Sequence, residues 1–321
     1  MTLALAPACP PDDATATDCA RLLARGYERL AALCEPLRLD VRWPGTRTGH
    51  EPYTTRQRPT TQVVGSVSKA HSADTLTDAP SASVHARYSV QQLASEPELL
   101  AGFLDAEASR IAADHVPVPR RHVVAARALH SYLWSVSLLL SGPWYLDRRV
   151  PVLGPRAVRS ELVGDRYEVT PGGFICLPDD PAARLPGVQI APDEAALGAA
   201  LRDGFAELVR PLLVAIAPAY RRGPRALWGM AGDDLVSGIW SLGRTLGEEE
   251  RAVRLAGEVL PYGIAPFPDG ANFRRLAGSD GRTHLTRTRT GCCLYYAIQP
   301  AEACGTCPRT GDAERLRRLE G

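Results

Sequence analysis

The sequence has almost no lysine. Lys69 is the only lysine among 37 basic residues, and 36 acidic residues balance them to a formal net charge of +1. A chain this close to neutrality has no long-range field that would attract nucleic acid or an anionic membrane. We therefore expect neither among its partners. A small ligand recognised by local contacts suits this composition better.

Long hydrophobic runs are also missing. No stretch reaches the roughly 20 apolar residues that span a bilayer, and the most apolar one, residues 129–140, contains His130 and three serines and predicts a core helix. Residues 2–8 before Cys9 are a poor export signal, because no basic residue precedes them and the run is short. We expect no transmembrane segment and a cytoplasmic location, where thiols stay reduced.

Several motifs that would indicate a nucleotide or hydrolase site do not occur. The sequence has no G-x-G-x-x-G after a strand, no G-x4-G-K-[ST], no H-E-x-x-H and no G-x-S-x-G. Its seven histidines form no i, i+4 pair that would place two ligands on one helical turn. Redox chemistry in this chain would therefore need electrons from another protein.

The 321 residues, 45% of them hydrophobic, can fill a sizeable core. Apolar spacing predicts a mainly α protein with a small antiparallel β-sheet, an α+β fold. We expect Pro211 to break or kink its helix, and Ser95 to Glu98 to form a capping box that opens another. Helices are predicted over 12–34, from 95 past 111, and over 120–141, 193–217, 224–246 and 248–259; strands over 158–163, 166–170 and 174–177.

Composition divides the chain into three regions. Residues 1–155 form an N-terminal helical and loop region, in which 41–88 predict weak strands and loops. Residues 156–290 hold the β-hairpin and further helices. Residues 291–321 form a short C-terminal segment that is rich in cysteine.

The eight cysteines are unevenly distributed. Cys9, Cys19, Cys34 and Cys176 are scattered, and the last three occur in apolar patterns where a thiol serves as a small buried hydrophobe. The other four fall close together as C-C-x10-C-x2-C: Cys292, Cys293, Cys304 and Cys307. This clustering makes them the candidate functional residues.

Four clustered thiols favour a metal centre. Four thiolates complete a tetrahedral Zn²⁺ site or supply the terminal ligands of a [2Fe-2S] cluster. Disulfides fit poorly, because a cytosolic chain is kept reduced and a bond between adjacent cysteines closes a strained ring.

The spacing modestly favours iron-sulfur over zinc. Zinc sites usually use two C-x2-C knuckles, and only Cys304 to Cys307 forms one here. Adjacent side chains in an extended chain point to opposite faces, so Cys292 and Cys293 would reach a single small ion only with backbone distortion. The ligand positions of a two-iron cluster lie farther apart, which relaxes this demand.

These residues resemble a known family. The segments Arg289-Thr-Gly-Cys-Cys-Leu-Tyr-Tyr296 and Cys304-Gly-Thr-Cys-Pro308 are similar to the C-terminal [2Fe-2S] domain of the FhuF-like ferric siderophore reductases. The resemblance covers about thirty residues; elsewhere only chain length, the C-terminal placement and the helix start Arg225-Ala-Leu-Trp228 agree. It implies a [2Fe-2S] cluster held by Cys292, Cys293, Cys304 and Cys307.

The same resemblance implies a function. It predicts an oxidoreductase that reduces ferric iron in a hydroxamate siderophore by one electron and so releases it. The electrons would come from an external donor such as a ferredoxin or a flavoprotein reductase. Two alternatives stay open: a non-catalytic protein whose C-terminus is stapled by zinc, and an iron-sulfur redox sensor.

Other residues carry weaker expectations. Asp233 and Asp234 resemble a metal pair, but a helical pattern more often places such residues on a solvated face. His284 precedes the cysteines closely enough to lie near them. We expect His122 and His130 at the surface or satisfied in the core. Trp134, Trp144, Trp228 and Trp240 are expected in the core, with stacking on a siderophore as the alternative.

Arginines flank the cysteine segment on both sides. Arg287 and Arg289 alternate in a strand-like run and should share a face, where they and Arg309 could raise the potential of a cluster. The alternative is that solvent screens them. Arg315, Arg317 and Arg318 are expected on a solvated helix face.

Overall fold

The computed structural model describes residues 13–34, 37–42, 53–54, 86–115, 119–162, 166–279, 281–299 and 303–320. Helices dominate these residues, and the predicted α+β class is confirmed. The helices are α1 (Asp13–Leu33), α2 (Val90–Ser95), α3 (Pro97–Asp114), α4 (Arg121–Asp147), α5 (Glu194–Tyr220), α6 (Pro224–Thr245), α7 (Glu249–Val259), α8 (Asp312–Glu320) and the 3-10 helix η1 (Tyr295–Ala297).

Helix α4 is the centre of the helical body. It packs against α1, α3, α5 and α6, and most of its residues from Val123 to Tyr145 are buried. By length and composition α4 could also cross a membrane, but 72% of its apolar stretch is buried inside the protein. Such burial is typical of a core helix, as the sequence predicts for residues 129–140.

The strands form three small sheets. One has the order β2-β1-β6-β5-β3 and another the order β4-β7-β8, while β9 and β10 form a hairpin. Directions are mixed, because β1 runs parallel to β6 and β7 parallel to β8, whereas the other pairs are antiparallel. The strands are β1 (Arg38–Val41), β2 (Tyr53–Thr54), β3 (Arg87–Ser89), β4 (Val150–Pro151), β5 (Val158–Glu161), β6 (Arg166–Val169), β7 (Phe174–Cys176), β8 (Val188–Ile190), β9 (Phe273–Ala277) and β10 (Thr283–Arg287).

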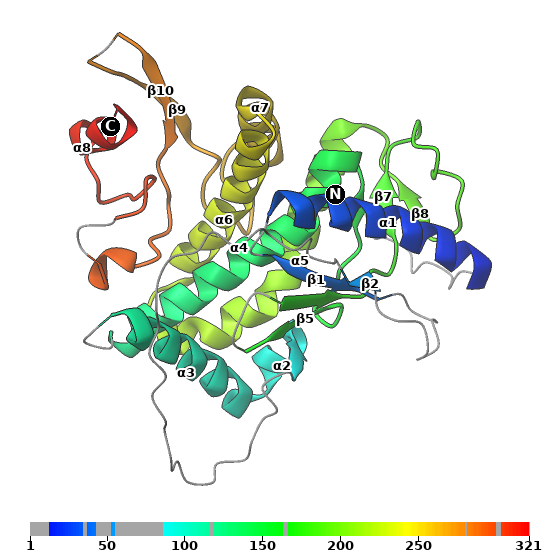
Figure 1. Cartoon of the computed structure of the whole chain (residues 1–321), viewed down its shortest axis with the longest axis horizontal. Helices are drawn as coiled ribbons and strands as arrows, with labels where there is room; N and C mark the ends of the chain where they lie inside the picture. Colours follow the sequence, from blue (N-terminus) through cyan, green and yellow to red (C-terminus); the bar gives the residue numbers. More distant parts are fainter. Residues whose placement is uncertain are drawn as a thin grey trace, which may run out of the picture.

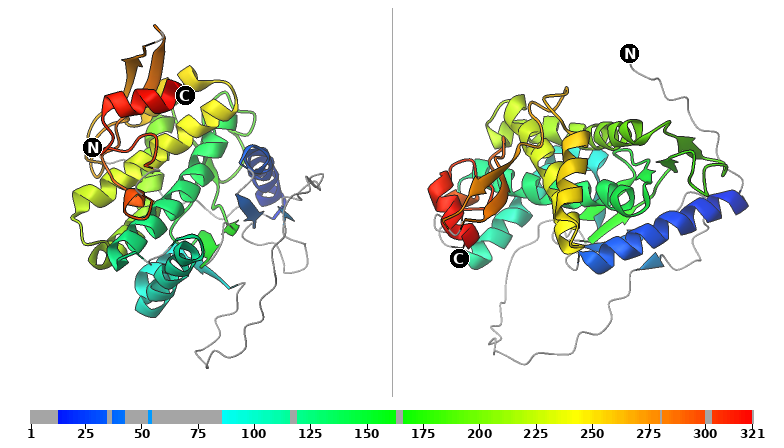
Figure 2. Two further views of the ribbon diagram at one scale, coloured as in Figure 1. Left: turned by 60° about the vertical axis from the view of Figure 1, so that its left-hand side comes forward. Right: turned by 90° about the horizontal axis from the view of Figure 1, so that it is seen from above.

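The β9-β10 hairpin and helix α8 lie apart from the other two sheets (Figures 1 and 2). In Figures 1 and 2 the orange and red hairpin β9-β10 and α8 lie at one end of the helical body, opposite β7 and β8. The division into three regions stays a prediction, although β1 and β6 pair across the boundary at residue 155.

Most predicted helices are confirmed to within a few residues, but the predicted capping box and a break at Pro211 are wrong. Helix α5 continues through Pro211, because the buried side chains around it hold the helix against the core and offset one missing hydrogen bond. The capping box lies at Ser89 and Gln92, at the start of α2, and Ser95 is the last residue of that helix. As expected, Pro97 is the first residue of α3. Of the predicted weak strands in 41–88, most residues lie outside the described part.

The contact between α6 and α7 requires a glycine. A Cβ on Gly243 would lie 2.2 Å from the Cβ of Ala252 in α7 and 3.1 Å from the Glu248 carbonyl oxygen. We expect Gly243→Ala to destabilise the protein by about 1–3 kcal/mol, because the two helices must separate. Gly257→Ala in α7 is the control, because nothing lies within 4 Å of its added Cβ. Equal urea midpoints for the two variants would contradict this prediction.

Candidate metal centre

The β9-β10 hairpin delivers the chain to helix α6. Its strands pair from Phe273 with Arg287 to Ala277 with Thr283. After β10, residues 288–291 leave the hairpin and reach the two vicinal cysteines. Arg287, the last residue of β10, and Arg289, two residues later, both reach α6, as their alternation predicts.

Arg287 is fully buried against Asp233. Its guanidinium donates to the Asp233 carboxylate at 2.5 Å, to the Asp233 carbonyl at 2.8 Å and to the Ser237 hydroxyl at 2.9 Å. Burial raises the pKa of Asp233, and the charges of Arg287 and Arg289 oppose that rise. The pair therefore fixes the end of β10 on α6 without any contact with solvent.

Arg289 forms a second buried pair one residue farther along α6. It donates to Asp234 at 2.8 Å, and Nδ1 of His130 on α4 lies 3.0 Å from the same carboxylate. Burial disfavours ionisation of Asp234, but His130 and Arg289 hold its pKa below the usual value. His130 is thus half-buried and hydrogen-bonded, between the two positions expected for it.

The expectation of solvated aspartates is therefore wrong, as is the alternative that solvent screens Arg287 and Arg289. Asp233 and Asp234 are 3% and 0% exposed. Sequence pattern alone missed this, because an aspartate pair has the same signature whether its partners are water or buried arginines more than 50 residues away. The run of arginines at 287 and 289 was the available signal.

Gly291 places the cysteines close to α6. Its N–H donates to the Asp233 carboxylate at 2.6 Å. A Cβ at this position would lie 2.6 Å from the Met230 nitrogen, which is helix backbone and cannot move aside. The glycine before Cys292 is thus required by close approach of two backbones.

The turn after the vicinal cysteines directs amide groups at their sulfurs. Leu294 adopts the left-handed conformation with φ of 58°. The N–H of Leu294 donates to the Cys292 thiol and that of Tyr295 to the Cys293 thiol. Such N–H···S bonds stabilise thiolates and help set the potential of a cluster that they hold.

The C-x2-C knuckle returns to the same place. Cys307 N–H donates to the Cys304 carbonyl at 2.9 Å, which closes the turn. The thiols of Cys304 and Cys293 are hydrogen-bonded to each other. This bond lowers the pKa of Cys293 and raises that of Cys304. Cys293 and Cys307 are buried, and Cys292 and Cys304 are half-buried. The structure therefore brings the four predicted cysteines together.

Arg315 of α8 binds backbone carbonyls of the knuckle. It is 2% exposed, and its guanidinium donates to the carbonyls of Arg287 at 2.9 Å, Gly305 at 3.1 Å, Cys307 at 2.8 Å and Thr310 at 3.2 Å. The prediction of a solvated helix face is wrong for Arg315, because these four carbonyls replace water. Arg317 and Arg318 are at the exposed surface and pair with Glu314.

This arrangement fits a two-iron cluster. Four thiols from two turns are grouped, two receive backbone N–H donors, and Arg289 acts electrostatically on Cys293 and Cys304. Within the described residues, no three His, Cys, Asp or Glu side chains are arranged as the ligands of one metal ion. We infer that Cys292, Cys293, Cys304 and Cys307 would hold the cluster.

An open cleft of about 850 Å³ borders this centre. Thr306, between the knuckle cysteines, and Arg289 line it on one side. Arg127 and His130, which also line it, are close enough to lower the pKa of Cys293 by their charge. The remaining lining residues come from α4 and α6: Ser131, Trp134, Ser135, Ser237, Trp240, Ser241, Arg244 and Thr245.

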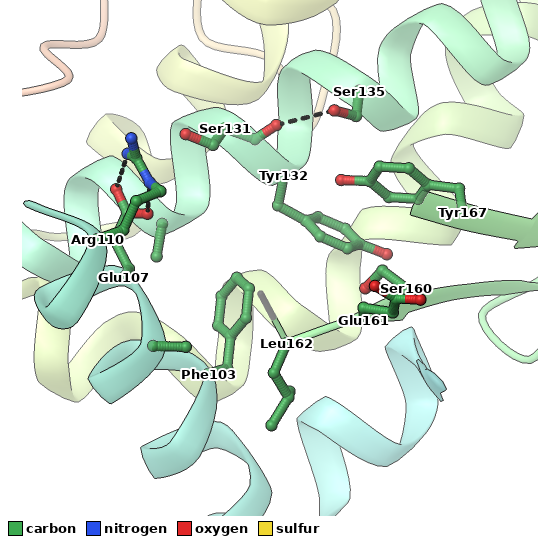
Figure 3. A pocket seen from close by; sticks show the side chains of 12 residues that line it. Phe103, Glu107, Arg110, Ser131, Tyr132, Ser135, Ser160, Glu161, Leu162 and Tyr167 are labelled. Atoms are coloured by element: carbon green, nitrogen blue, oxygen red, sulfur yellow. Dashed lines mark hydrogen bonds and ion pairs between the residues drawn. The ribbon is translucent and has the colours of Figure 1, made fainter. Parts of the chain in front are cut away.

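A second hollow of about 420 Å³ lies beside α4 (Figure 3). Ser131 and Ser135 line both. On the far side of these serines the wall is aromatic, with Phe103, Tyr132 and Tyr167 around the opening. Among the described residues of 291–320, none lines this hollow.

The other cysteines lie away from the metal centre. Cys19 and Cys176 are buried and Cys34 is half-buried, as expected of structural thiols, while Cys9 lies outside the described residues.

The remaining candidate residues are buried or half-buried side chains, apart from Arg309. Trp144 is buried, and Trp228 is half-buried beside Phe267. His122 is half-buried on α4, and His284 is half-buried in β10, opposite Leu276. Arg309 stacks over Tyr296, with its guanidinium carbon 4.4 Å from the ring centre.

We expect Asp233→Asn to destabilise the protein by about 3–5 kcal/mol, because it leaves Arg287 buried without a counter-charge. Exchanging Arg274, which pairs with Asp312 at the surface, for Gln is the control and should change the urea midpoint far less. If both variants unfold at the wild-type urea midpoint, the ion pair between Asp233 and Arg287 does not stabilise the packing of β10 on α6, and the prediction is wrong.

Comparison with known proteins agrees with this geometry. No curated protein matches the chain significantly. A family model described as the FhuF 2Fe-2S C-terminal domain matches residues 289–309, the span that runs from Arg289 through all four clustered cysteines. The cofactor of this chain is therefore a [2Fe-2S] cluster. The chain is an iron-sulfur protein that carries, at its C-terminus, the 2Fe-2S domain of the FhuF-like siderophore-related proteins.

Proposed function

We propose that this protein is a ferric siderophore reductase that acts on hydroxamate-type chelates. The observation that carries the proposal is the cleft of about 850 Å³ whose wall includes Thr306 of the knuckle. A chelate in this cleft would lie beside the cysteine segment, with no protein domain between them. The resemblance to FhuF-like proteins supports the same substrate class.

The chemistry is a single electron transfer. A [2Fe-2S] cluster held by Cys292, Cys293, Cys304 and Cys307 would, once reduced by an external donor, supply the one electron that converts chelated Fe³⁺ to Fe²⁺. Hard hydroxamate oxygens bind Fe²⁺ much more weakly than Fe³⁺, so iron can leave the chelate. No bond to the protein has to form, and no side chain acts as acid, base or nucleophile.

The chain's own residues have three tasks in this scheme. Trp134 and Trp240 offer aromatic surface in the cleft for the organic part of the chelate. Amide N–H groups at Leu294 and Tyr295 stabilise the charge on two sulfurs. The buried pairs of Arg287 and Arg289 keep the cysteine segment fixed on α6, so that the distance to the cleft does not vary.

The proposal includes a cytoplasmic location and an external electron donor. A ferredoxin or a flavoprotein reductase would reduce the cluster, because the sequence has no dinucleotide fingerprint. The cluster would accept electrons near the surface, since Cys292 and Cys304 are only half-buried. An iron-sulfur sensor would share these features but would not turn over a chelate.

We expect Cys292→Ser, Cys293→Ser, Cys304→Ser and Cys307→Ser each to abolish or strongly change the visible spectrum, because each removes a cluster ligand. Cys19→Ser, Cys34→Ser and Cys176→Ser are matched controls, since these thiols lie outside the cysteine segment. A wild-type spectrum and iron content in the Cys292→Ser protein would remove that residue as a ligand. A colourless wild-type protein with bound zinc would refute the cluster.

The reductase activity is tested with a complete electron chain. We expect rapid formation of Fe²⁺, trapped by a ferrous-specific chelator, when the protein is mixed with a ferric hydroxamate siderophore, a ferredoxin, its reductase and NADPH. NADPH alone should not bleach the cluster, because no site for it is evident in the sequence. A cluster that is reduced by the donor but never reoxidised by the chelate would refute the reductase and favour a sensor.

A further inference from the structure

The cleft beside the cysteine segment has an uneven charge. Three arginines and one histidine are among its twelve lining residues, and none of the twelve is Asp or Glu. Two of these side chains, Arg289 and His130, are already paired with the buried carboxylate of Asp234. The charge available to a ligand therefore comes from Arg127 and Arg244.

Both of these arginines are held in place by aromatic rings. The guanidinium carbon of Arg127 lies 5.1 Å from the centre of the Tyr295 ring, and that of Arg244 lies 5.6 Å from the centre of the Trp240 ring. Within the described residues Arg127 has no carboxylate at ion-pair distance. Arg244 forms an exposed ion pair with Glu249 at 3.9 Å, which solvent screens, and the same carboxylate accepts a hydrogen bond from the Trp240 indole N–H at 2.8 Å. Guanidinium groups that are held in this way are suited to bind carboxylates.

Three hydroxamates neutralise ferric iron, so the charge of such a chelate is decided by its other groups. A chelate that replaces one hydroxamate by a hydroxycarboxylate, or carries a free carboxylate, is an anion. Electron transfer then adds one further negative charge to it. A positive cleft favours this anion before the transfer and favours it more afterwards.

We propose that the cleft selects anionic ferric chelates, of the mixed hydroxamate and carboxylate class, through Arg127 and Arg244. This inference rests on the proposed function and adds the charge class of its substrate. The aromatic and hydroxyl lining between the two arginines would receive the uncharged body of the chelate. An acidic electron donor could bind the same two arginines instead. However, a concave cleft lined by Trp134 and Trp240 suits a small ligand better than a protein surface.

The test uses one hydroxamate framework with three charges. Ferrioxamine B carries a free amine and a charge of +1; its N-acetyl and N-succinyl derivatives are neutral and anionic. Their gallium complexes have the same shape and charge but accept no electron, so calorimetric titration measures binding apart from redox chemistry. We expect the anion to bind about tenfold more tightly than the cation at low salt, and the difference to shrink at high salt.

The variants assign the preference to residues. Arg127→Gln and Arg244→Gln should each reduce the difference between the three gallium complexes. The control is Arg210→Gln, which removes an exposed arginine that also stacks on a tryptophan, Trp228, but does not line the cleft. This control should retain the full preference.

The outcomes separate this inference from the proposed function. Equal binding of the three gallium complexes, with normal reduction of the ferric forms, would overturn the charge selection and leave the reductase intact. Charge-dependent gallium binding without reduction of any ferric form would uphold the selection and overturn the reductase. If Arg127→Gln slows reduction of the cluster by ferredoxin but leaves gallium binding unchanged, these charges serve donor docking and the inference is wrong.

Discussion

Two buried ion pairs determine where the iron-sulfur centre lies. They join helix α6 to the residues that immediately precede the vicinal cysteines. Arg287 binds Asp233 and Arg289 binds Asp234, and all four side chains are nearly or fully buried. A buried charge without a partner is costly, so displacing these residues from α6 would leave Asp233 and Asp234 buried without counter-charges. The position of the cysteines depends on this constraint.

The remaining contacts of the segment build on these pairs. Asp233 also accepts the N–H of Gly291, which brings the vicinal cysteines against the backbone of α6. Arg315 binds the carbonyl of Arg287 and, with the same guanidinium, the carbonyl of Cys307. One side chain thus connects the strand that precedes the first two cysteines to the turn that holds the last two. A cluster bound by both turns would complete this set of connections.

The ion pairs also link the metal centre to the cleft. His130 reaches Asp234 from α4, so the two helices that line most of the cleft meet the cysteine segment at one carboxylate. Because Arg289 and His130 are paired at this point, Arg127 and Arg244 are the cations left to face a ligand, and Glu249 offsets part of the charge of Arg244. The same buried aspartate that fixes the segment therefore also decides which cations remain available for recognition.

Sequence by itself determined most of the helices and the hairpin β5-β6, because these depend on local periodicity. It also indicated the cluster type, because the cysteine motif resembles that of a known iron-sulfur domain. It could not determine which charges are buried. Asp233, Asp234 and Arg315 have ordinary helical patterns, and only contacts with residues far away in the chain for the aspartates, or with backbone carbonyls for the arginine, remove them from solvent. Pro211 and Ser95 show the same limit on a smaller scale, since neighbouring packing decided whether a helix continued. The cleft, too, exists only in the tertiary structure, because Arg127, Trp240 and Thr306 come from three separate segments.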